Sequence, residues 1–146
     1  MKRVYSNEKL CLDCKLCEVY CKVAHSQTKD IIKAYKEETP SPVPRIRVEG
    51  GKLLSVAVSC RHCDDPACVE ACITGAMMKD SETGAVYNDP ERCVGCMTCA
   101  VACPYGCIKV GDIALKCDLC DLSGNPACVE HCPNNALIYV EGGSER

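Results

Sequence analysis

The sequence predicts a small α+β protein of two cysteine-rich modules, each made of short helices and β-hairpins, with one module discontinuous along the chain. Three observations lead to this expectation. The 146 residues include 17 cysteines but no Trp and no Phe, so apolar burial alone would give only a modest core. Sixteen of the cysteines fall into four short runs. Between the runs lie apolar segments with Gly-bearing turns, which are typical of hairpins.

Runs one and three have a compact spacing of cysteines, while runs two and four open the gap before the third cysteine to four and seven residues. The segment CVGCMTCAVACP, from Cys93 to Pro104, has three cysteines at every third residue, a fourth after three more, and a proline behind it. Bacterial ferredoxins hold 4Fe-4S clusters with this spacing, and the fourth thiolate of a run serves a second cluster. In chain order, runs one to four are Cys11, Cys14, Cys17 and Cys21; Cys60, Cys63, Cys68 and Cys72; Cys93, Cys96, Cys99 and Cys103; and Cys117, Cys120, Cys128 and Cys132.

Iron–sulfur clusters are favoured over two other uses of so many cysteines. Disulfides belong to oxidising compartments, and the N-terminus MKRVYSNEKLC shows no export signal. Zinc usually takes two well-separated Cys-x2-Cys pairs and gains nothing from a third cysteine at the same spacing. Sixteen ligands therefore predict four 4Fe-4S clusters. Cys107, which lies outside the runs, is expected to be a buried inert thiol.

The hairpins connect the runs in order. The approach to run one, RVYSNEKLC, matches the approach to run three, AVYNDPERC, where a hairpin with a turn at Thr83-Gly84 comes first. We therefore expect an N-terminal strand at 2–6 to pair with a C-terminal strand at 136–140. Two more hairpins, with turns at Glu49-Gly50-Gly51 and Gly111-Asp112, precede runs two and four. Those runs end in similar tails, DDPACVEAC and GNPACVEHC, which indicates duplication of a half-chain unit.

This strand pairing predicts which runs share clusters. Runs two and three form a ferredoxin-like module at 60–107, and runs one and four form a second module from 1–21 plus 108–146, with 22–59 as an insertion that carries a hairpin. Because the fourth cysteine of each run crosses to the partner cluster, four ligand sets follow. They are Cys11, Cys14, Cys17 and Cys132; Cys117, Cys120, Cys128 and Cys21; Cys60, Cys63, Cys68 and Cys103; and Cys93, Cys96, Cys99 and Cys72.

The insertion and the histidines each leave two interpretations open. Asp30 to Glu37 can make two helical turns, and the following TPSPVP must be extended because of its prolines. This segment either shields clusters from water or docks a partner subunit. His25, His62 and His131 lie in or near the runs. They are not needed as ligands, and each either packs without a role or donates a hydrogen bond to a cluster sulfur.

Composition and charge narrow the function to electron transfer. The formal net charge is −3, and four loaded clusters, each about −2 with its thiolates, bring it to about −11. Nucleic acid is therefore not expected as a partner, whereas a basic docking face on another protein is. With four cysteines per cluster no iron keeps an open position, and no nucleotide-binding fingerprint is present. We expect a closely spaced conducting series of clusters and no catalytic residues.

The four runs resemble those of the electron-transfer subunits with four 4Fe-4S clusters that accompany molybdenum and tungsten oxidoreductases, formate dehydrogenases and hydrogenases. Within that group, residues 24–49, AHSQTKDIIKAYKEETPSPVPRIRVE, look most like the iron–sulfur subunit associated with carbon monoxide dehydrogenase. The resemblance implies a double ferredoxin fold and a relay of low-potential electrons from carbon monoxide dehydrogenase to a flavin- or NAD(P)-linked oxidoreductase or a hydrogenase. The alternatives are the same relay for a formate dehydrogenase, hydrogenase or aldehyde oxidoreductase, and a free polyferredoxin.

Location follows from the same features. No segment approaches the roughly 18 uninterrupted apolar residues of a membrane span, and only 14 residues (146 − 132) follow Cys132, so we expect no membrane insertion by this chain and a soluble acceptor. Low cluster potentials imply strong oxygen sensitivity. An anaerobic cytoplasm is the expected location.

Overall fold

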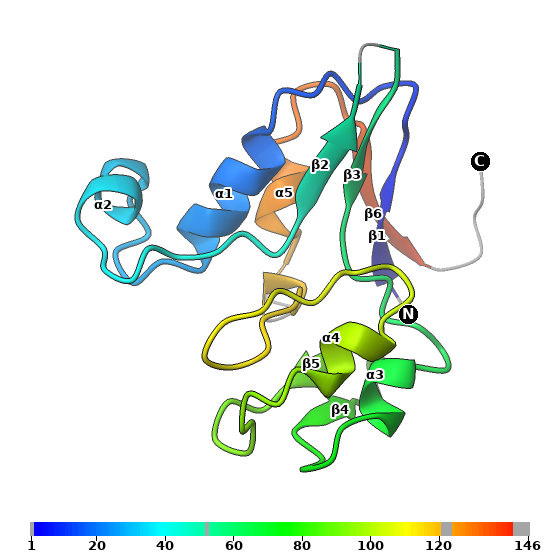
Figure 1. The fold of residues 1–146 in the computed structure, drawn as a ribbon. Coiled ribbons are helices and arrows are strands. Elements are labelled where there is room, and N and C mark those ends of the chain that lie inside the picture. Colours follow the sequence, from blue (N-terminus) through cyan, green and yellow to red (C-terminus); the bar gives the residue numbers. More distant parts are fainter. Residues whose placement is uncertain (1, 52, 121–123, 142–146) are drawn as a thin grey trace.

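The computed structural model describes residues 2–51, 53–120 and 124–141 of the chain, and Figure 1 shows its arrangement of short elements joined by loops. Strands and helices of mostly three to six residues agree with the expected α+β fold. The elements are β1 (Lys2–Ser6), α1 (Leu16–Ala24), α2 (Ile31–Lys36), β2 (Arg47–Gly50), β3 (Ser55–Val58), α3 (Ala67–Glu70), β4 (Met77–Lys79), β5 (Val86–Asn88), α4 (Thr98–Ala102), α5 (Ala127–Glu130) and β6 (Leu137–Glu141).

The two ends of the chain form an antiparallel pair, as predicted. β1 pairs with β6 in a register that places Val4 opposite Tyr139, and β6 begins one residue later than expected. At the end of the pair, the backbone N–H of Asn7 donates to the carbonyl of Ala136 at 2.7 Å. The hairpin β4–β5 has the same closing bond, from Asp89 N–H to the carbonyl of Ala76 at 2.8 Å. The two approaches to runs one and three are thus the same structural element.

The other two predicted hairpins differ in outcome. β2 and β3 pair antiparallel, and the connection falls at residues 51–54, slightly after the predicted turn. Between runs three and four the described residues contain no strand pair, and a single bridge joins Lys109 to Leu115. Beside this bridge, the carbonyl of Ala114 accepts a hydrogen bond from the side-chain amide of Asn88 at 2.9 Å.

The short helices repeat in pairs. α3 and α5 have the same sequence, ACVE, and both follow a proline, Pro66 or Pro126. α1 and α4 both follow a residue in the left-handed conformation, Lys15 at φ 58° and Met97 at φ 59°. α1 packs on α5 and α3 packs on α4, which Figure 1 shows in its upper and lower halves. The helix of run one thus meets that of run four, and the helix of run two meets that of run three.

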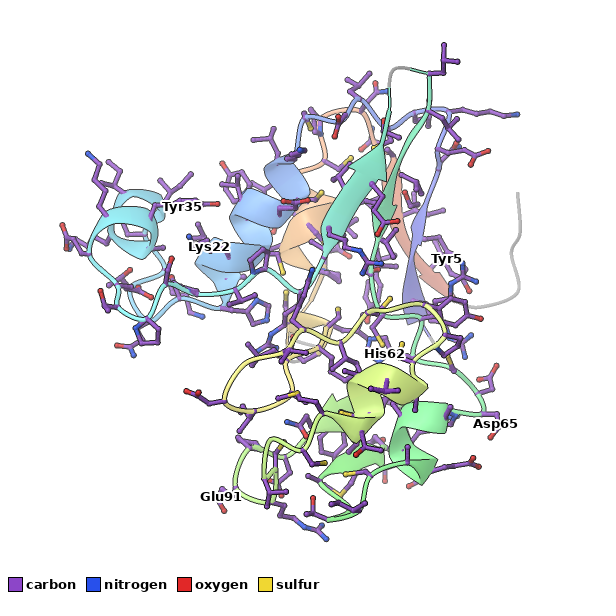
Figure 2. All side chains as sticks on the ribbon, viewed as in Figure 1. Tyr5, Lys22, Tyr35, His62, Asp65 and Glu91 are labelled. Atoms are coloured by element: carbon purple, nitrogen blue, oxygen red, sulfur yellow. The ribbon has the colours of Figure 1, made fainter. Side chains whose placement is uncertain are left out.

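The insertion carries the predicted short helix. Asp30 caps α2 by accepting from the backbone N–H groups of Ile32 and Lys33, both at 2.9 Å, as expected for an N-cap aspartate. α2 packs on α1, and the ammonium of Lys22 lies 3.7 Å from the centre of the Tyr35 ring (Figure 2). None of the helices in the described ranges is long and apolar enough to cross a membrane.

Buried side chains form two groups that largely follow the two halves of the structure, although Ala85, next to β5, packs with the first group. The first group is Val4, Cys17, Cys21, Ile46, Ala57, Ala85, Leu119, Cys128 and Leu137. The second group is Met77, Val86, Cys99, Ile108 and Ala114. Ile108 and Ala114 therefore pack with runs two and three, although the predicted division at residue 108 places them with runs one and four. Cysteines are members of both groups, which explains how a chain without Trp or Phe has a core.

Candidate metal centres

Two of the four predicted ligand sets line separate hollows. All four thiols of the first set border one hollow, the Cys11 hollow: Cys11, Cys14, Cys17 and Cys132. All four thiols of another set border a second, the Cys60 hollow: Cys60, Cys63, Cys68 and Cys103. In each hollow three cysteines come from one run and the fourth from the partner run.

The other two sets are brought together as electrostatic neighbours. Burial raises the pKa of the Cys99 thiol, and the nearby thiols of Cys72, Cys93 and Cys96 raise it further. Burial likewise raises the pKa of Cys128, with added contributions from Cys117, Cys21, Cys120 and, from the neighbouring set, Cys17. Each set again combines three cysteines of one run with the fourth of its partner. The members of each predicted set thus lie near one another, and their assignment to one cluster each stays a prediction.

The donor set suits 4Fe-4S clusters. Each group contains four sulfur donors from two chain segments, the ligand set of such clusters. In the part of the chain that the structure describes, no three His, Cys, Asp or Glu side chains converge as the ligands of one metal ion would. The sixteen cysteines of the runs are thus the candidate cluster ligands, as the sequence predicts.

The four Cys-x2-Cys loops share one backbone feature that sequence reasoning did not anticipate. The residue just before the second cysteine has a positive φ in every run: Asp13 at 53°, His62 at 45°, Gly95 at 70° and Leu119 at 59°. The left-handed region costs a non-glycine residue about 1–2 kcal/mol. Gly95 adopts this conformation without strain, Asp13 and His62 belong to the types that enter it more often than most, and Leu119 does not favour it. The loops are thus built alike despite their different side chains.

Backbone N–H groups point at the fourth cysteine of three runs. Arg45 donates to Cys21 Sγ at 3.2 Å, Met77 to Cys72 Sγ at 3.3 Å, and Ala136 to Cys132 Sγ at 3.2 Å. Hydrogen bonds to a thiolate stabilise its charged form. At Cys72, burial works to raise the pKa, but the bond from Met77 and further bonds lower it overall. Three of the four runs thus share a backbone N–H contact at the sulfur of their fourth cysteine.

Several other thiols are buried deeply enough to remain protonated in the absence of iron. Burial raises the pKa of Cys17 to about 12 and that of Cys117 to about 12. Only thiolates bind iron, so cluster assembly must remove these protons. Neutral thiols can pack in the core of the iron-free chain, and the same side chains become charged ligands when iron binds.

Cys107 lies beside the Cys60 hollow but is bonded elsewhere. Its thiol donates to the carbonyl of Ser59 at 3.2 Å and to that of Tyr105 at 3.4 Å. The side chain is buried, and burial raises its pKa to about 11. These contacts agree with the expected inert thiol.

The three histidines differ in how they approach the cysteines. Nδ1 of His25 lies 2.7 Å from the carbonyl oxygen and 3.7 Å from the sulfur of Cys21. Nδ1 of His62 accepts the backbone N–H of Val86 at 3.0 Å. The ring of His131 stacks on Tyr20, with 3.5 Å between ring centres. The ring of His25 thus lies next to a cysteine sulfur, whereas His62 approaches one through its backbone, with its N–H donating to Cys60 Sγ at 3.4 Å.

His25 belongs to a charged cluster next to Cys21. Asp118 accepts from Nε2 of His25 at 3.0 Å and from the guanidinium of Arg45. Burial opposes both charges, but the mutual contacts prevail: they raise the pKa of His25 to about 9 and hold that of Asp118 well below its usual range. The cluster joins α1, the segment just before β2 and run four.

Runs one and three present their ends to solvent. Cys14 and Cys96 are the exposed cysteines of the sixteen. At the same position in each loop stands an apolar side chain that is about two-thirds exposed, Leu12 at 66% and Val94 at 67%. The equivalent positions of runs two and four carry Arg61 and Asp118 instead. The first and third runs therefore offer apolar, accessible approaches to their thiols.

Comparison with known proteins agrees with the geometry. A family model described as a 4Fe-4S dicluster domain matches residues 52–141. The electron transport protein HydN of Escherichia coli strain K12 is 38% identical over 90% of this chain and 83% of its own length. The NADH-dependent phenylglyoxylate dehydrogenase subunit beta of Aromatoleum evansii is 37% identical over 89% of this chain and 28% of its own.

A solved structure shares the fold. A chain of the active site complex BamBC of benzoyl coenzyme A reductase superposes with a TM-score of 0.50 and 22% sequence identity, covering 100% of this chain and 82% of that one. At this identity the likeness extends to the fold.

Proposed function

We propose that this chain, which belongs to the 4Fe-4S dicluster domain family, relays electrons between two redox enzymes through four 4Fe-4S clusters. It is an electron-transfer iron–sulfur protein of the same kind as HydN. The proposed number of four clusters rests on one observation. The sixteen thiols fall into four sets, each drawn from two paired runs.

The ligand sets support a relay rather than substrate chemistry. A bound 4Fe-4S cluster accepts and releases one electron at a time. Four thiolates on each cluster leave no open position on iron, and the backbone N–H groups of Arg45, Met77 and Ala136 donate hydrogen bonds to the sulfurs of Cys21, Cys72 and Cys132. The protein contributes ligation, burial and fixed charge, which together set the potential of each centre.

The exposed loops of runs one and three support a path for electrons across the molecule, from one loop to the other. Leu12 lies next to the Cys11 hollow, and Val94 lies in the loop of run three. We assign electron entry and exit to these two ends because an apolar rim around an exposed thiol lets a partner exclude water from the contact. The sets that contain Cys60 and Cys117 then lie between them.

As donor we propose carbon monoxide dehydrogenase, and as acceptor a flavin- or NAD(P)-linked oxidoreductase or a hydrogenase. The support is the resemblance of residues 24–49, which include α2, to the subunit associated with that dehydrogenase. α2 exposes Ile31, Ile32 and Tyr35 and gives the insertion an apolar surface for a large subunit. A reducing compartment, the cytoplasm, suits sixteen thiol ligands.

A second candidate is the same relay inside a different dehydrogenase. The similarity to the beta subunit of an NADH-dependent phenylglyoxylate dehydrogenase favours it. In that case this chain works as a fixed subunit, and the nicotinamide-linked partner takes the place of the separate acceptor.

Purification under strict anoxia from the source organism tests the function. Iron and acid-labile sulfide are counted on the purified sample, and bound proteins are identified by mass spectrometry. About sixteen irons per chain together with carbon monoxide dehydrogenase support the proposal. Another bound dehydrogenase selects the second candidate, whereas a fully loaded chain without partners makes it a diffusible carrier and overturns the fixed assignment.

A further inference from the structure

Lys116 is a buried cation at the junction of the two halves of the molecule. Its side chain is 3% exposed. The ammonium donates to the carbonyl of Val86 in β5 and to the carbonyl of Cys117 at 3.0 Å. Because Cys117 opens run four and Val86 belongs to the module of runs two and three, Lys116 joins both halves through its hydrogen bonds.

The charge of Lys116 has no carboxylate partner among the described residues. Carbonyl oxygens satisfy its hydrogen bonds but carry only partial charge. A buried ammonium without an opposite charge is strongly unfavourable. The burial of Lys116 therefore indicates a nearby negative group that offsets the cost of burying its charge.

The thiols around Lys116 identify that group. Lys116 borders the Cys60 hollow together with Cys60, Cys63, Cys68 and Cys103. Burial raises the pKa of Cys68, and the charge of Lys116 is the largest of the opposing effects. It also lowers the pKa of Cys117 against a larger effect of burial. The ammonium thus acts on thiolates of both halves.

His62 and Lys116 bind the same residue of β5, Val86. The backbone N–H of Val86 donates to Nδ1 of His62 at 3.0 Å, while the carbonyl of the same residue accepts from Lys116. Two side chains therefore bind the outer edge of β5. One is His62, within run two, and the other is Lys116, the residue just before run four. Figure 2 shows His62 at the junction of the upper and lower parts.

We propose that Lys116 is the built-in counter-charge of the cluster held by Cys60, Cys63, Cys68 and Cys103, and that it raises the reduction potential of that cluster. A 4Fe-4S cluster with four thiolates carries about −2 when oxidised and about −3 after accepting one electron. A fixed positive charge in a buried site stabilises the more negative form. The electron then has a favoured position where it passes between the two halves. This inference depends on the four-cluster function proposed above.

The test uses neutral replacements in the fully loaded protein. Lys116→Met keeps the length of the side chain, and Lys116→Gln keeps a donor for the carbonyl of Val86. EPR-monitored potentiometric titration under anoxia follows each cluster. In both variants we expect one centre to lose about tenfold in its reduced fraction at a fixed potential, a shift of about 59 mV to more negative potential. Lys116→Arg, which keeps the charge, should remain near the wild type.

Controls separate the outcomes. Lys36→Met removes an exposed charge on α2 and should shift no centre. Wild-type potentials in both neutral variants, with full iron content, overturn the proposal. If the neutral variants lose about four irons, full loading of Lys116→Arg supports a need for charge, and iron loss in all three variants overturns it in favour of packing. Iron near sixteen in the wild type tests the proposed function independently, since that count does not depend on Lys116.

Discussion

The guanidinium of Arg45 pairs with the carboxylate of Asp118, which ties the segment just before β2 to run four. Both side chains are about one-fifth exposed. The same backbone segment donates from Arg45 N–H to the sulfur of Cys21 at 3.2 Å. The pair therefore holds a cysteine of run one and two cysteines of run four, Cys117 and Cys120, in one place.

Asp118→Asn should loosen this part of the molecule. Loss of a partly buried hydrogen-bonded charge pair costs about 1–3 kcal/mol, which raises the population of open forms about five- to hundredfold. The Asp118→Asn variant should then lose iron to a chelator faster than the wild type does, when both are measured under anoxia. Asp64→Asn is the matched control, because Asp64 pairs with Arg3 while 86% exposed, and such a surface pair contributes little. Equal release rates for the two variants would refute a structural role for Asp118.

Gly95→Ala should disrupt the loop of run three. The added Cβ would lie 2.3 Å from the carbonyl oxygen of Asp112, and φ at this position is +70°. We expect loss of about four irons, measured by iron and sulfide content after anaerobic reconstitution. Asp13→Gly changes the equivalent residue of run one in the opposite direction and should retain full iron, since glycine adopts this conformation without strain. A fully loaded Gly95→Ala protein would show that the loop tolerates a shift of Asp112.

Cys107→Ala should keep all the iron of the wild type. Its thiol is bonded to the carbonyls of Ser59 and Tyr105, so its removal costs about 1 kcal/mol of packing and hydrogen bonding but no ligand. Cys103→Ala, four residues earlier, removes a proposed ligand of the same hollow and should cost up to four irons. The comparison is made by iron content and by the EPR spectrum of the reduced protein. Loss of iron in Cys107→Ala would make this thiol a ligand.

Leu12→Glu and Val94→Glu test the two ends of the relay. Each places a charge on an exposed apolar side chain beside an exposed cysteine, which should weaken docking without loss of iron. Stopped-flow reduction by the donor and oxidation by the acceptor should respond to different variants, each slowing about tenfold. Val101→Glu, at an 88% exposed position of α4, controls for charge alone. If neither variant changes either rate, electrons enter and leave elsewhere.

The strand pairing and the grouping of runs followed from repetition in the sequence. The approaches to runs one and three end in matching bonds at Asn7 and Asp89, and the two ACVE helices match in the same way. These features could be predicted from local patterns because the chain contains two similar copies of each segment, and each copy helps to interpret the other. The predicted hairpin at Gly111-Asp112 is reduced to one bridge, and the side chain of Asn88, from a distant segment, binds the carbonyl of Ala114 beside it.

What the sequence did not reveal depends on contacts between distant segments. In the sequence, Lys116 is one residue of a predicted short hairpin. It is buried only because β5 and the Cys60 hollow surround it in the folded chain. Arg45 and Asp118 are 73 positions apart. The left-handed residue Leu119 gives no local signal either, since the geometry of the cysteine loop imposes its conformation.

Native mass spectrometry of the anaerobically purified chain tests the four-cluster assignment most directly. The mass above that of the polypeptide, with iron and sulfide counted on the same sample, should correspond to four 4Fe-4S clusters, and Cys132→Ala and Cys11→Ala should each remove the same single cluster because both cysteines border one hollow. A wild-type mass that corresponds to two clusters, or the loss of different clusters in the two variants, would contradict the assignment.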